Sequence, residues 1–494
     1  MDAQRITVLA DITEIGENAF EYCRNLVSID IPGSVTSIGR YAFAECSSLE
    51  TVVLPQNIKT IESNVFASCS ALTSVTIPYG VTSIGESAFF DCSALENITI
   101  PESVESIGNR AFLSCLSLKE IIIPYRVKTI EEYTFLNCRN LVSVTIPDSV
   151  TSIGGGAFAQ CTKLKSIVIP ENVVSIGSGA FERCYRLVEI YNLSQLQFEI
   201  GYTNYGMIAE YARAIHTNRS SESIIITEGD YVFCNVDGEY YLIDYVGTDA
   251  EITLPSDING NVYSINAGAF AQNTVITSVT VPEAITVIGE SAFRDCTSLE
   301  SITLQDGITE IGEVAFSGCE SLLSIDLPDT VTRIGSMAFS TCTSLTSVTV
   351  PSNVTDMGNF VFSGCSALES VSLPNGLTSI SNGMFSGCSA LKSITLPSSL
   401  TAIGASAFED CSSLESIVIP ATVSYIRSRA FRYCSSLATV TFEVPSAWYL
   451  SNDIYFDSIY ATVSATDIAN DSKAAELLTS TYSEYYWSNN YVAS

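Results

Sequence analysis

The chain has 494 residues, of which 47% are hydrophobic and 15% are charged, and its formal net charge is -32. Such an acidic surface repels phosphate backbones and anionic lipid headgroups, so the composition argues against nucleic-acid binding and against a membrane-surface role. No run approaches the roughly 18 consecutive apolar residues of a membrane-spanning helix, so we expect no direct insertion into a membrane.

The first residues, "MDAQRITVLADITEIGENAF", do not form a signal peptide, because no charged segment, apolar segment and cleavage site follow one another. A repeat unit begins within this stretch instead. We therefore expect that any export signal was removed before the first residue of this chain.

A repeat of 23 residues organises most of the sequence. Starting from its cysteine, the unit reads C-x2-L-x2-(I/V)-x-(I/L/V)-P-x2-(V/I)-x2-I-G-x2-A-F-x2-C. The phenylalanine of the unit recurs at Phe20, Phe43, Phe66, Phe89, Phe112, Phe135, Phe158 and Phe181, then at Phe270, Phe293, Phe316, Phe339, Phe362, Phe385, Phe408 and Phe431. A period between about 20 and 50 residues is typical of a solenoid, in which each unit stacks on its neighbours because it cannot close its own core.

The segment "LTSVTIP" (Leu72–Pro78) alternates between apolar and polar residues and predicts a short strand. Val75 and Ile77 point inward in this interpretation, and Ser74 and Thr76 point outward. Proline then ends the strand, because it cannot donate a ladder hydrogen bond.

The remainder of the unit is predicted to close the coil. "VTSIG" (Val81–Gly85) turns two more apolar side chains inward, and its glycine allows a bend where a side chain would obstruct. "ESAFFDC" (Glu86–Cys92) predicts a short helical or 3-10 turn, with its alanine, phenylalanine and cysteine facing the core.

The cysteines follow the same period, which indicates a structural role. They lie at Cys23, Cys46, Cys69, Cys92, Cys115, Cys138, Cys161 and Cys184, then at the isolated Cys234, and then at Cys296, Cys319, Cys342, Cys365, Cys388, Cys411 and Cys434. They form no close pairs of the kind a zinc site needs, and their equal spacing differs from a disulfide framework. Asn273 replaces the cysteine of one unit, so we interpret the thiols as small buried groups without hydrogen-bonding demands. We expect no metal and no other cofactor.

Two arrays of about eight repeats are predicted from this register, each followed by a segment that caps it. The first array is assigned to residues 1–190 and the second to residues 263–441. A capping insert is assigned to residues 191–262, and a C-terminal cap to residues 442–494. The cap is expected to contain a helix over Asp471–Ser480.

The insert contains two predicted elements. Tyr205–His216 carries apolar residues at helical spacing, which suits a helix that covers the open end of a stack. Farther along, Asp237 and Gly238 lie between two stretches rich in β-formers, and this dipeptide predicts a hairpin turn.

No arrangement of residues indicates catalysis. The one histidine, His216, has no partner near it in sequence and is expected at the surface or at a helix end. The "GGG" at 154–156 is explained by the repeat rather than by phosphate binding, and "DINGN" at 257–261 lacks the acidic ligands of a calcium loop. We therefore predict that the chain is not an enzyme.

The unit "L-x2-V-x-I-P-x2-V-x2-I-G-x2-A-F-x2-C" resembles the leucine-rich repeat of BspA-like bacterial surface antigens and treponemal proteins. Leu141–Cys161 reads "LVSVTIPDSVTSIGGGAFAQC" and carries this pattern in full. It lacks the asparagine of the better-known leucine-rich repeat, so no buried asparagine ladder is expected. The resemblance implies a right-handed solenoid with parallel strands on a concave face, in bacterial proteins that are usually secreted or displayed on the cell surface.

The outward strand positions form a candidate binding surface. They are rich in hydroxyl groups and lack the large anchors of tight protein interfaces, so they predict weak, multivalent contacts, although serine and threonine also simply suit an exposed strand. The candidate residues are Ser74, Thr76, Asn97, Thr99, Ser143, Thr145, Ser278, Thr280, Ser301, Thr303, Ser347, Thr349, Ser393 and Thr395.

Tyrosine is concentrated in the insert and in the C-terminal tail, where it serves either recognition or cap packing. The candidate residues in the insert are Tyr202, Tyr205, Tyr240 and Tyr241. A small basic cluster, Arg427, Arg429 and Arg432, suits an acidic partner, but a solvated face is the ordinary interpretation.

The favoured function is a non-catalytic, secreted or cell-surface interaction module, adhesin-like, that binds a host or microbial surface protein or glycan, and a monomer is expected. The alternative is a spacer or substrate-targeting solenoid of a larger multidomain surface enzyme. Rows of Ser-x-Thr could also meet an ordered lattice such as ice or crystalline polysaccharide, but curvature argues against this third hypothesis.

Overall fold

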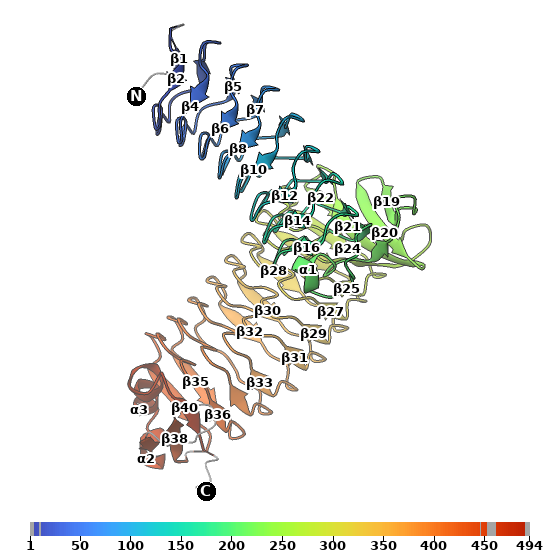
Figure 1. Cartoon of the computed structure of the whole chain (residues 1–494). Coiled ribbons are helices and arrows are strands. Elements are labelled where there is room, and N and C mark those ends of the chain that lie inside the picture. The colour runs from blue at the N-terminus through green and yellow to red at the C-terminus, as the bar shows by residue number, and fades with distance from the viewer. Residues whose placement is uncertain (1–3, 9–10, 445, 452–460, 490–494) are drawn as a thin grey trace. The chain divides into compact units, whose positions relative to one another are not determined.

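Each repeat folds into one coil with two short strands and a turn, and equivalent strands of successive coils pair in parallel (Figure 1). The computed structural model describes residues 4–8, 11–444, 446–451 and 461–489. The chain divides into two units, Met1–Ile225 and Ile226–Ser494, and each unit is described by itself.

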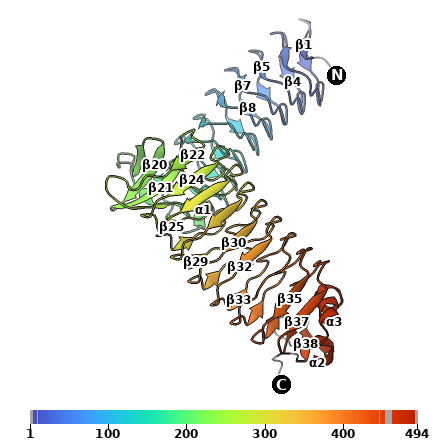
Figure 2. The ribbon, with the colours of Figure 1, turned by 180° about the vertical axis from the view of Figure 1, so that it is seen from behind.

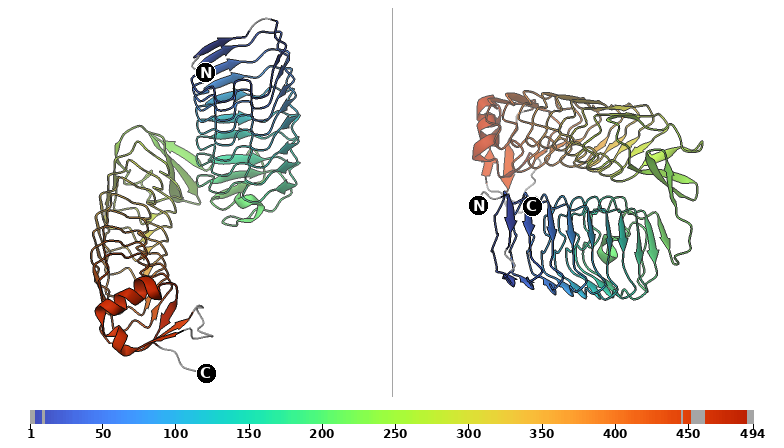
Figure 3. Two further views of the ribbon diagram at one scale, coloured as in Figure 1. Left: turned by 90° about the vertical axis from the view of Figure 1, so that its left-hand side faces the viewer. Right: turned by 90° about the horizontal axis from the view of Figure 1, so that it is seen from above.

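In the first unit, the first strand of each coil pairs with the residues 23 positions later, as Ser74 does with Asn97. Figure 3 shows these strands stacked along the unit. They are β1 (Arg5–Thr7), β3 (Ser28–Asp30), β5 (Thr51–Val53), β7 (Ser74–Thr76), β9 (Asn97–Thr99), β11 (Glu120–Ile122), β13 (Ser143–Thr145), β15 (Ser166–Ile169), β17 (Glu189–Asn192) and β18 (Ala214–His216). The second strands are β2 (Glu14–Ile15), β4 (Ser37–Ile38), β6 (Thr60–Ile61), β8 (Ser83–Ile84), β10 (Ser106–Ile107), β12 (Thr129–Ile130), β14 (Ser152–Ile153) and β16 (Ser175–Ile176).

The second unit repeats this architecture, and its first strands lie side by side in Figure 2. They are β22 (Glu251–Thr253), β24 (Ser278–Val281), β26 (Ser301–Leu304), β28 (Ser324–Asp326), β30 (Ser347–Thr349), β32 (Ser370–Ser372), β35 (Ser416–Ile419) and β37 (Thr439–Phe442). The second strands are β23 (Tyr263–Ile265), β25 (Val287–Ile288), β27 (Glu310–Ile311), β29 (Arg333–Ile334), β31 (Asp356–Met357), β33 (Ser379–Ile380), β34 (Ala402–Ile403) and β36 (Tyr425–Ile426).

The core of each unit is a stack of identical layers. The phenylalanine rings are stacked and nearly parallel, with centroids 5.3 to 5.6 Å apart in the first unit and 4.7 to 5.8 Å apart in the second. Val75 and Ile77 are buried, and Ser74 and Thr76 are exposed, which confirms the predicted faces of the strand. One continuous apolar interior per unit therefore supplies the main stabilisation.

The third side of the coil is a series of turns that differs from a helix in its backbone. Ser87 and Asp91 have φ values of 53° and 56°, in the left-handed region. These residues redirect the peptide groups, so that Ser87 N and Phe89 N donate to carbonyl oxygens of the next coil, at 2.9 and 2.8 Å. Ala88, Phe89 and Cys92 are buried as predicted, but inter-coil hydrogen bonds hold this side together instead of a helical ladder.

The buried thiols make weak hydrogen bonds, which the sequence did not indicate. Cys92 Sγ donates to Phe66 O of the previous coil at 3.1 Å. Fourteen cysteines repeat this contact at 3.0 to 3.4 Å. Because a thiol is a weak donor, the contact adds modest energy while the sulfur fills the layer.

The helix predicted over Tyr205–His216 is not formed. α1 (Asn204–Met207) is a single turn with left-handed backbone at Tyr205 and Gly206, and Ala214–His216 is strand β18. The segment completes a longer ninth coil, because β18 pairs with β17 and Phe181 N donates to Gly206 O at 2.8 Å. Ile208, Ala209 and Ala212 are buried against the last regular layer, so the segment still covers the stack.

The second unit begins with the predicted hairpin. β20 (Tyr231–Val236) and β21 (Glu239–Tyr245) are antiparallel, and they are joined by Asp237 and Gly238, both with positive φ. β19 (Ile225–Glu228) precedes this hairpin. β21 then pairs in parallel with β23 of the first coil, so the hairpin supplies an edge on which the array starts.

The described part of the C-terminal segment covers the other end of the second unit. It contains β38 (Trp448–Ser451), β39 (Ala461–Val463), α2 (Ala465–Ile468), α3 (Asp471–Glu476), a π turn (Leu477–Thr481) and β40 (Tyr486–Ser488). The helix predicted over Asp471–Ser480 is thus present, with its last turn widened. Trp448 and Trp487 are buried, and the ring of Trp448 packs against Phe442 of the last coil.

Candidate functional site

The outward side chains of the first strands form what we call the outer sheet face. In the first unit the predicted hydroxyl and amide positions are all exposed, and in the second unit Ser301, Thr303, Ser347 and Thr349 are exposed as well. Ser278 and Thr280 are half-buried near the hairpin. Ser393 and Thr395 are exposed, but the structure assigns no strand to their segment. The rows of hydroxyl groups therefore exist, with a break in the second unit.

Large exposed side chains lie within or next to the hydroxyl rows of the first unit, and they are not among the candidates named from the sequence. Tyr79 is 74% exposed, Val53 is 70% exposed and Ile122 is 64% exposed. Around two of them lies a groove of about 600 Å³, which we call the Tyr79 groove. Its polar and apolar walls include Tyr79, Asn97, Thr99, Glu102, Glu120 and Ile122. The outward strand positions of this groove hold no tryptophan, tyrosine or arginine, and its tyrosine lies just beyond strand β7.

The Tyr79 groove is acidic. Glu102 accepts a hydrogen bond from the backbone N of Tyr125 at 3.1 Å, which fixes its carboxylate at the rim. Neither Glu102 nor Glu120 has a cationic partner in the part of the chain that the structure describes. By contrast, Glu96 is neutralised by Lys119 at 2.8 Å, and the hydrogen bond from this ammonium group holds the pKa of Glu96 below its ordinary value.

The tyrosines of the insert differ in exposure. Tyr202 is exposed, whereas Tyr205 packs edge-on against Phe198 with centroids 5.5 Å apart. Tyr240 is half-buried against the core of the second unit, and the hydroxyl of Tyr241 donates to Glu239 at 2.6 Å. Cap packing thus accounts for part of this set, and Tyr202 retains the most free surface.

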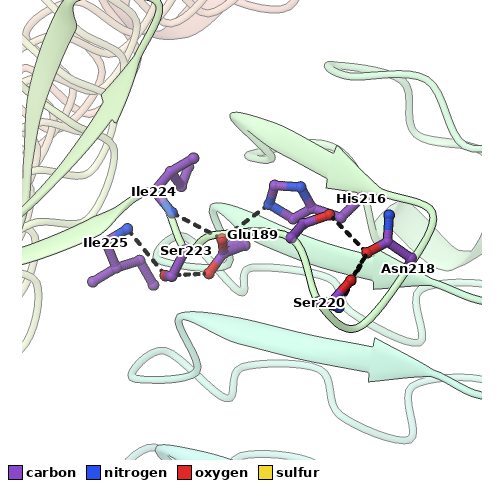
Figure 4. Close-up of polar contacts among 8 residues, drawn as sticks. Glu189, His216, Asn218, Ser220, Ser223, Ile224 and Ile225 are labelled. Atoms are coloured by element: carbon purple, nitrogen blue, oxygen red, sulfur yellow. Dashed lines mark hydrogen bonds and ion pairs between the residues drawn. The ribbon is translucent and has the colours of Figure 1, made fainter.

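His216 ends strand β18 and its side chain is only 16% exposed, so the expected position at the surface or at a helix end is wrong. Its Nε2 lies 3.0 Å from Oε1 of Glu189, a carboxylate that is buried at the end of the first unit (Figure 4). Glu189 also accepts from Ile224 N at 2.9 Å and from the hydroxyl of Ser223 at 2.8 Å. The imidazole lies over the ring of Tyr191, with centroids 4.7 Å apart.

This cluster is built to close the ninth coil. Burial, and then the charge of Glu189, raise the pKa of the Tyr191 hydroxyl. Ser223 and His216 both contact the carboxylate and are not joined through the imidazole, so the order differs from a catalytic triad, in which histidine bridges the hydroxyl and the carboxylate. Contacts separated by 27 and 34 residues in the chain could not be found from sequence spacing.

The thiols are chemically protected by their surroundings. Burial raises the pKa of Cys46 to about 12, and it raises the pKa of Cys69 and Cys115 well above the ordinary value. A neutral buried thiol is a poor nucleophile and a poor metal ligand. In the described ranges there is no group of three or more potential metal-ligating side chains. The same residues contain no helix long and apolar enough to cross a bilayer.

Comparison with known repeat families identifies the architecture. The family described as "BspA type Leucine rich repeat region (6 copies)" matches residues 2–116, 82–203, 263–372 and 356–465. The chain belongs to the BspA-type leucine-rich repeat family. The predicted resemblance and the predicted leucine-rich repeat solenoid are therefore confirmed.

Several solved structures are similar to this BspA-type chain. A leucine rich cell surface protein from Faecalibacterium prausnitzii shares 30% identity over 80% of this chain and 88% of its own, with a TM-score of 0.35. A leucine-rich repeat protein from Bacteroides ovatus shares 27% identity over 89% and 91%, with a TM-score of 0.30. The T. pallidum leucine rich repeat protein shares 28% identity over 43% and 90%, with a TM-score of 0.36. No curated protein matches the chain.

Proposed function

We propose that this chain is a non-catalytic, secreted or cell-surface interaction module, adhesin-like, that binds a protein on a host or microbial surface. Membership of the BspA-type leucine-rich repeat family supports an interaction role. The similar Faecalibacterium prausnitzii protein is described as a cell surface protein, which supports the proposed location.

The observation that carries this proposal is the Tyr79 groove. A tyrosine and an isoleucine with more than half of their surface exposed line this hollow together with polar and acidic groups. Aromatic and aliphatic anchors surrounded by polar groups are typical of the energetic centre of a protein interface. The hydroxyl rows on either side then serve as the weaker rim.

The charge of the groove indicates the chemistry of the partner. Glu102 and Glu120 are not neutralised within the described chain, and the whole protein has a formal charge of -32. A partner segment with a lysine or arginine next to an apolar side chain complements both features. Electrostatic attraction to such a partner mainly speeds association and weakens with salt.

The insert contributes a second, smaller candidate surface. Tyr202 is 58% exposed and combines an apolar ring with a polar tip, which suits contact with a protein or a sugar. We propose it as an accessory contact, with Tyr205, Tyr240 and Tyr241 serving mainly in packing.

The proposal is tested with the whole chain and a panel of immobilised fibronectin, fibrinogen, laminin and mucin, together with intact epithelial and bacterial cells. Binding is measured by biolayer interferometry and by flow cytometry, for the wild type and for the double variant Tyr79→Ser/Ile122→Ser. Leu323→Ser is the matched control, because this leucine is similarly exposed, at 55%, in the second unit.

Removal of the two anchors should weaken binding at least about 30-fold, because even one hot-spot side chain contributes about 2 kcal/mol or more. Leu323→Ser should bind like the wild type. Absence of wild-type binding to every surface, or equal binding by the double variant, would contradict the proposal.

A further inference from the structure

Two coils near the C-terminal end of the second unit depart from the repeat at one bend. This position, directly after the second strand, is glycine in most coils, and a Cβ on Gly404 would meet Asn382 N at 2.6 Å. In the coils before and after Gly404 the position holds Ser381 and Arg427. A pocket of about 210 Å³ lies at these coils. We call it the Arg427 pocket, and its polar lining includes Asn359, Ser379, Ser381, Asn382 and Arg427.

The two amide groups of this pocket are oriented by the backbone. Oδ1 of Asn382 accepts a hydrogen bond from Ala405 N at 2.9 Å, and Oδ1 of Asn359 accepts one from Asn382 N at 3.2 Å. Ser381 is also engaged, since its hydroxyl donates to Met357 O at 2.7 Å. With both amide oxygens occupied, the Nδ2 groups remain as donors, and neither has an acceptor among the described residues. The pocket therefore presents N–H donors to a ligand.

Arg427 adds a cation to these donors. The neighbouring guanidinium groups are paired: Arg429 contacts Glu484 at 2.7 Å, and Arg432 contacts the same carboxylate at 3.1 Å. On an earlier coil Arg333 contacts Glu310 at 2.6 Å. Arg427 is exposed and has no acidic partner within the described ranges. In a chain with 54 acidic and 22 basic residues, an unpaired arginine beside two amide donors is a distinctive feature.

We propose that the Arg427 pocket binds the carboxylate of an acidic sugar residue, such as a uronic acid. The planar guanidinium group matches a carboxylate with two parallel hydrogen bonds, and charge-assisted bonds of this kind are the strong ones. The two amide groups and the exposed hydroxyl of Ser379 then meet ring hydroxyl groups. None of the residues that line the pocket is acidic, so no carboxylate there repels an anion.

The lining also favours a sugar over an acidic peptide. Ile380 is buried beneath the pocket, and no exposed aromatic or large aliphatic side chain lines it. A peptide would find no anchor there, whereas sugar hydroxyl groups find amides and a hydroxyl. The volume lies below the roughly 300 Å³ at which drug-sized sites begin, so the pocket suits one small residue.

The test is isothermal titration calorimetry of the full chain with sodium glucuronate and with an oligogalacturonate. Glucose and an acetylated, amidated aspartate-containing tripeptide are titrated as the neutral and the peptide probes. Two variants remove the proposed contacts. Arg427→Gln removes the cation, and Asn382→Asp keeps the acceptor for Ala405 N while it replaces the amide donor by an anionic oxygen. Arg333→Gln is the matched control, because it removes a paired arginine outside the pocket.

Glucuronate is expected to bind the wild type and the control equally, and to bind Arg427→Gln and Asn382→Asp at least about tenfold more weakly. Glucose and the peptide should bind the wild type no more tightly than they bind Arg427→Gln. Failure of glucuronate to bind the wild type, or equal binding by the variants, overturns the proposal. Tighter binding of the peptide assigns the pocket to acidic proteins and overturns it as well.

The circular dichroism spectrum of each variant is compared with that of the wild type to show that the variant is folded. If a variant unfolds, titration of glucuronate into the ¹⁵N-labelled wild type decides the question. The Nε–H resonance of an arginine, assigned to Arg427 by its loss in Arg427→Lys, should shift on binding. An unshifted resonance at saturation overturns the proposal. Because this pocket and the Tyr79 groove lie in different units, either proposal can fail without the other.

Discussion

A substitution in the stack of phenylalanine rings can separate the energy of ring stacking from the energy of apolar burial. Phe362 lies in the middle of the second stack, fully buried, with the centroids of Phe339 and Phe385 at 5.7 and 5.8 Å. Phe362→Leu retains most of the buried apolar volume and removes both ring contacts. Since one aromatic pair contributes about 0.5–1.5 kcal/mol beyond burial, this variant should lose about 1–3 kcal/mol.

Phe362→Ala should lose more, about 3–5 kcal/mol, because it also leaves a cavity between two rigid coils. The exposed Leu323→Ser should change the free energy of unfolding by no more than about 0.5 kcal/mol. The assay is urea unfolding followed by tryptophan fluorescence. The chain has only two tryptophans, and both Trp448 and Trp487 are buried at the C-terminal end of this same unit.

The reasoning requires an ordered result. The unfolding midpoint should fall in the order Leu323→Ser, Phe362→Leu, Phe362→Ala, with the slope of the free energy against urea unchanged. Equal midpoints for Phe362→Leu and the wild type would refute a stabilising role for ring stacking. A reduced slope would show instead that the unit no longer unfolds in one step.

Three further predictions concern other features of the coil. Gly85→Ala should lower the free energy of unfolding by about 1–3 kcal/mol in thermal unfolding, because its Cβ would meet Ser63 N at 2.6 Å. Gly33→Ala is the control, and because the space around Gly33 is open it should be neutral or stabilising by up to about 1 kcal/mol. Equal melting temperatures of the two variants would contradict the steric argument. Native thiols should not react with Ellman's reagent at pH 8. Rapid labelling of the native chain would refute the burial of these groups. Folding also raises the pKa of Cys46 from 9.0 to about 12, so the unfolded chain loses this proton at a lower pH than the folded chain. The contribution of Cys46 to the free energy of unfolding should therefore be complete below pH 9 and fall as the pH rises towards 12. Glu189→Ala removes the acceptor for His216, Ser223 and Ile224, so hydrogen exchange over residues 214–225 should accelerate by a factor that corresponds to about 2 kcal/mol or more, and unchanged protection there would show that the carboxylate does not hold this segment.

Much of the fold could be predicted because each position of the repeat has one physical role. A phenylalanine that returns every 23 residues must lie in one stack, and alternation in "LTSVTIP" assigns Val75 inward and Ser74 outward without any long-range information. The Asp237–Gly238 hairpin is of the same kind, since the positive φ values it needs are a local property. The prediction of a helix over residues 205–216 was wrong, because apolar spacing alone does not distinguish a helix from a coil whose turns contain left-handed residues.

The candidate sites depended on departures from the repeat, and these gain meaning only in three dimensions. Tyr79 and Ile122 are 43 positions apart in the sequence, and the stacking of coils brings them to one groove. Asn359 and Arg427 likewise meet in one pocket from different coils. The orientation of Asn382 follows from a backbone N–H of the next coil, which no pattern in the sequence reveals.

The sequence by itself determined the coil, its core residues and the family, because periodic burial is written into every unit. The tertiary structure alone decided which exceptions to the period lie next to one another, which carboxylate closes the ninth coil, and which arginine lies beside the two amide groups of a pocket. The physical reason is that burial depends on the local pattern, whereas charge pairing and pocket shape depend on distances across coils.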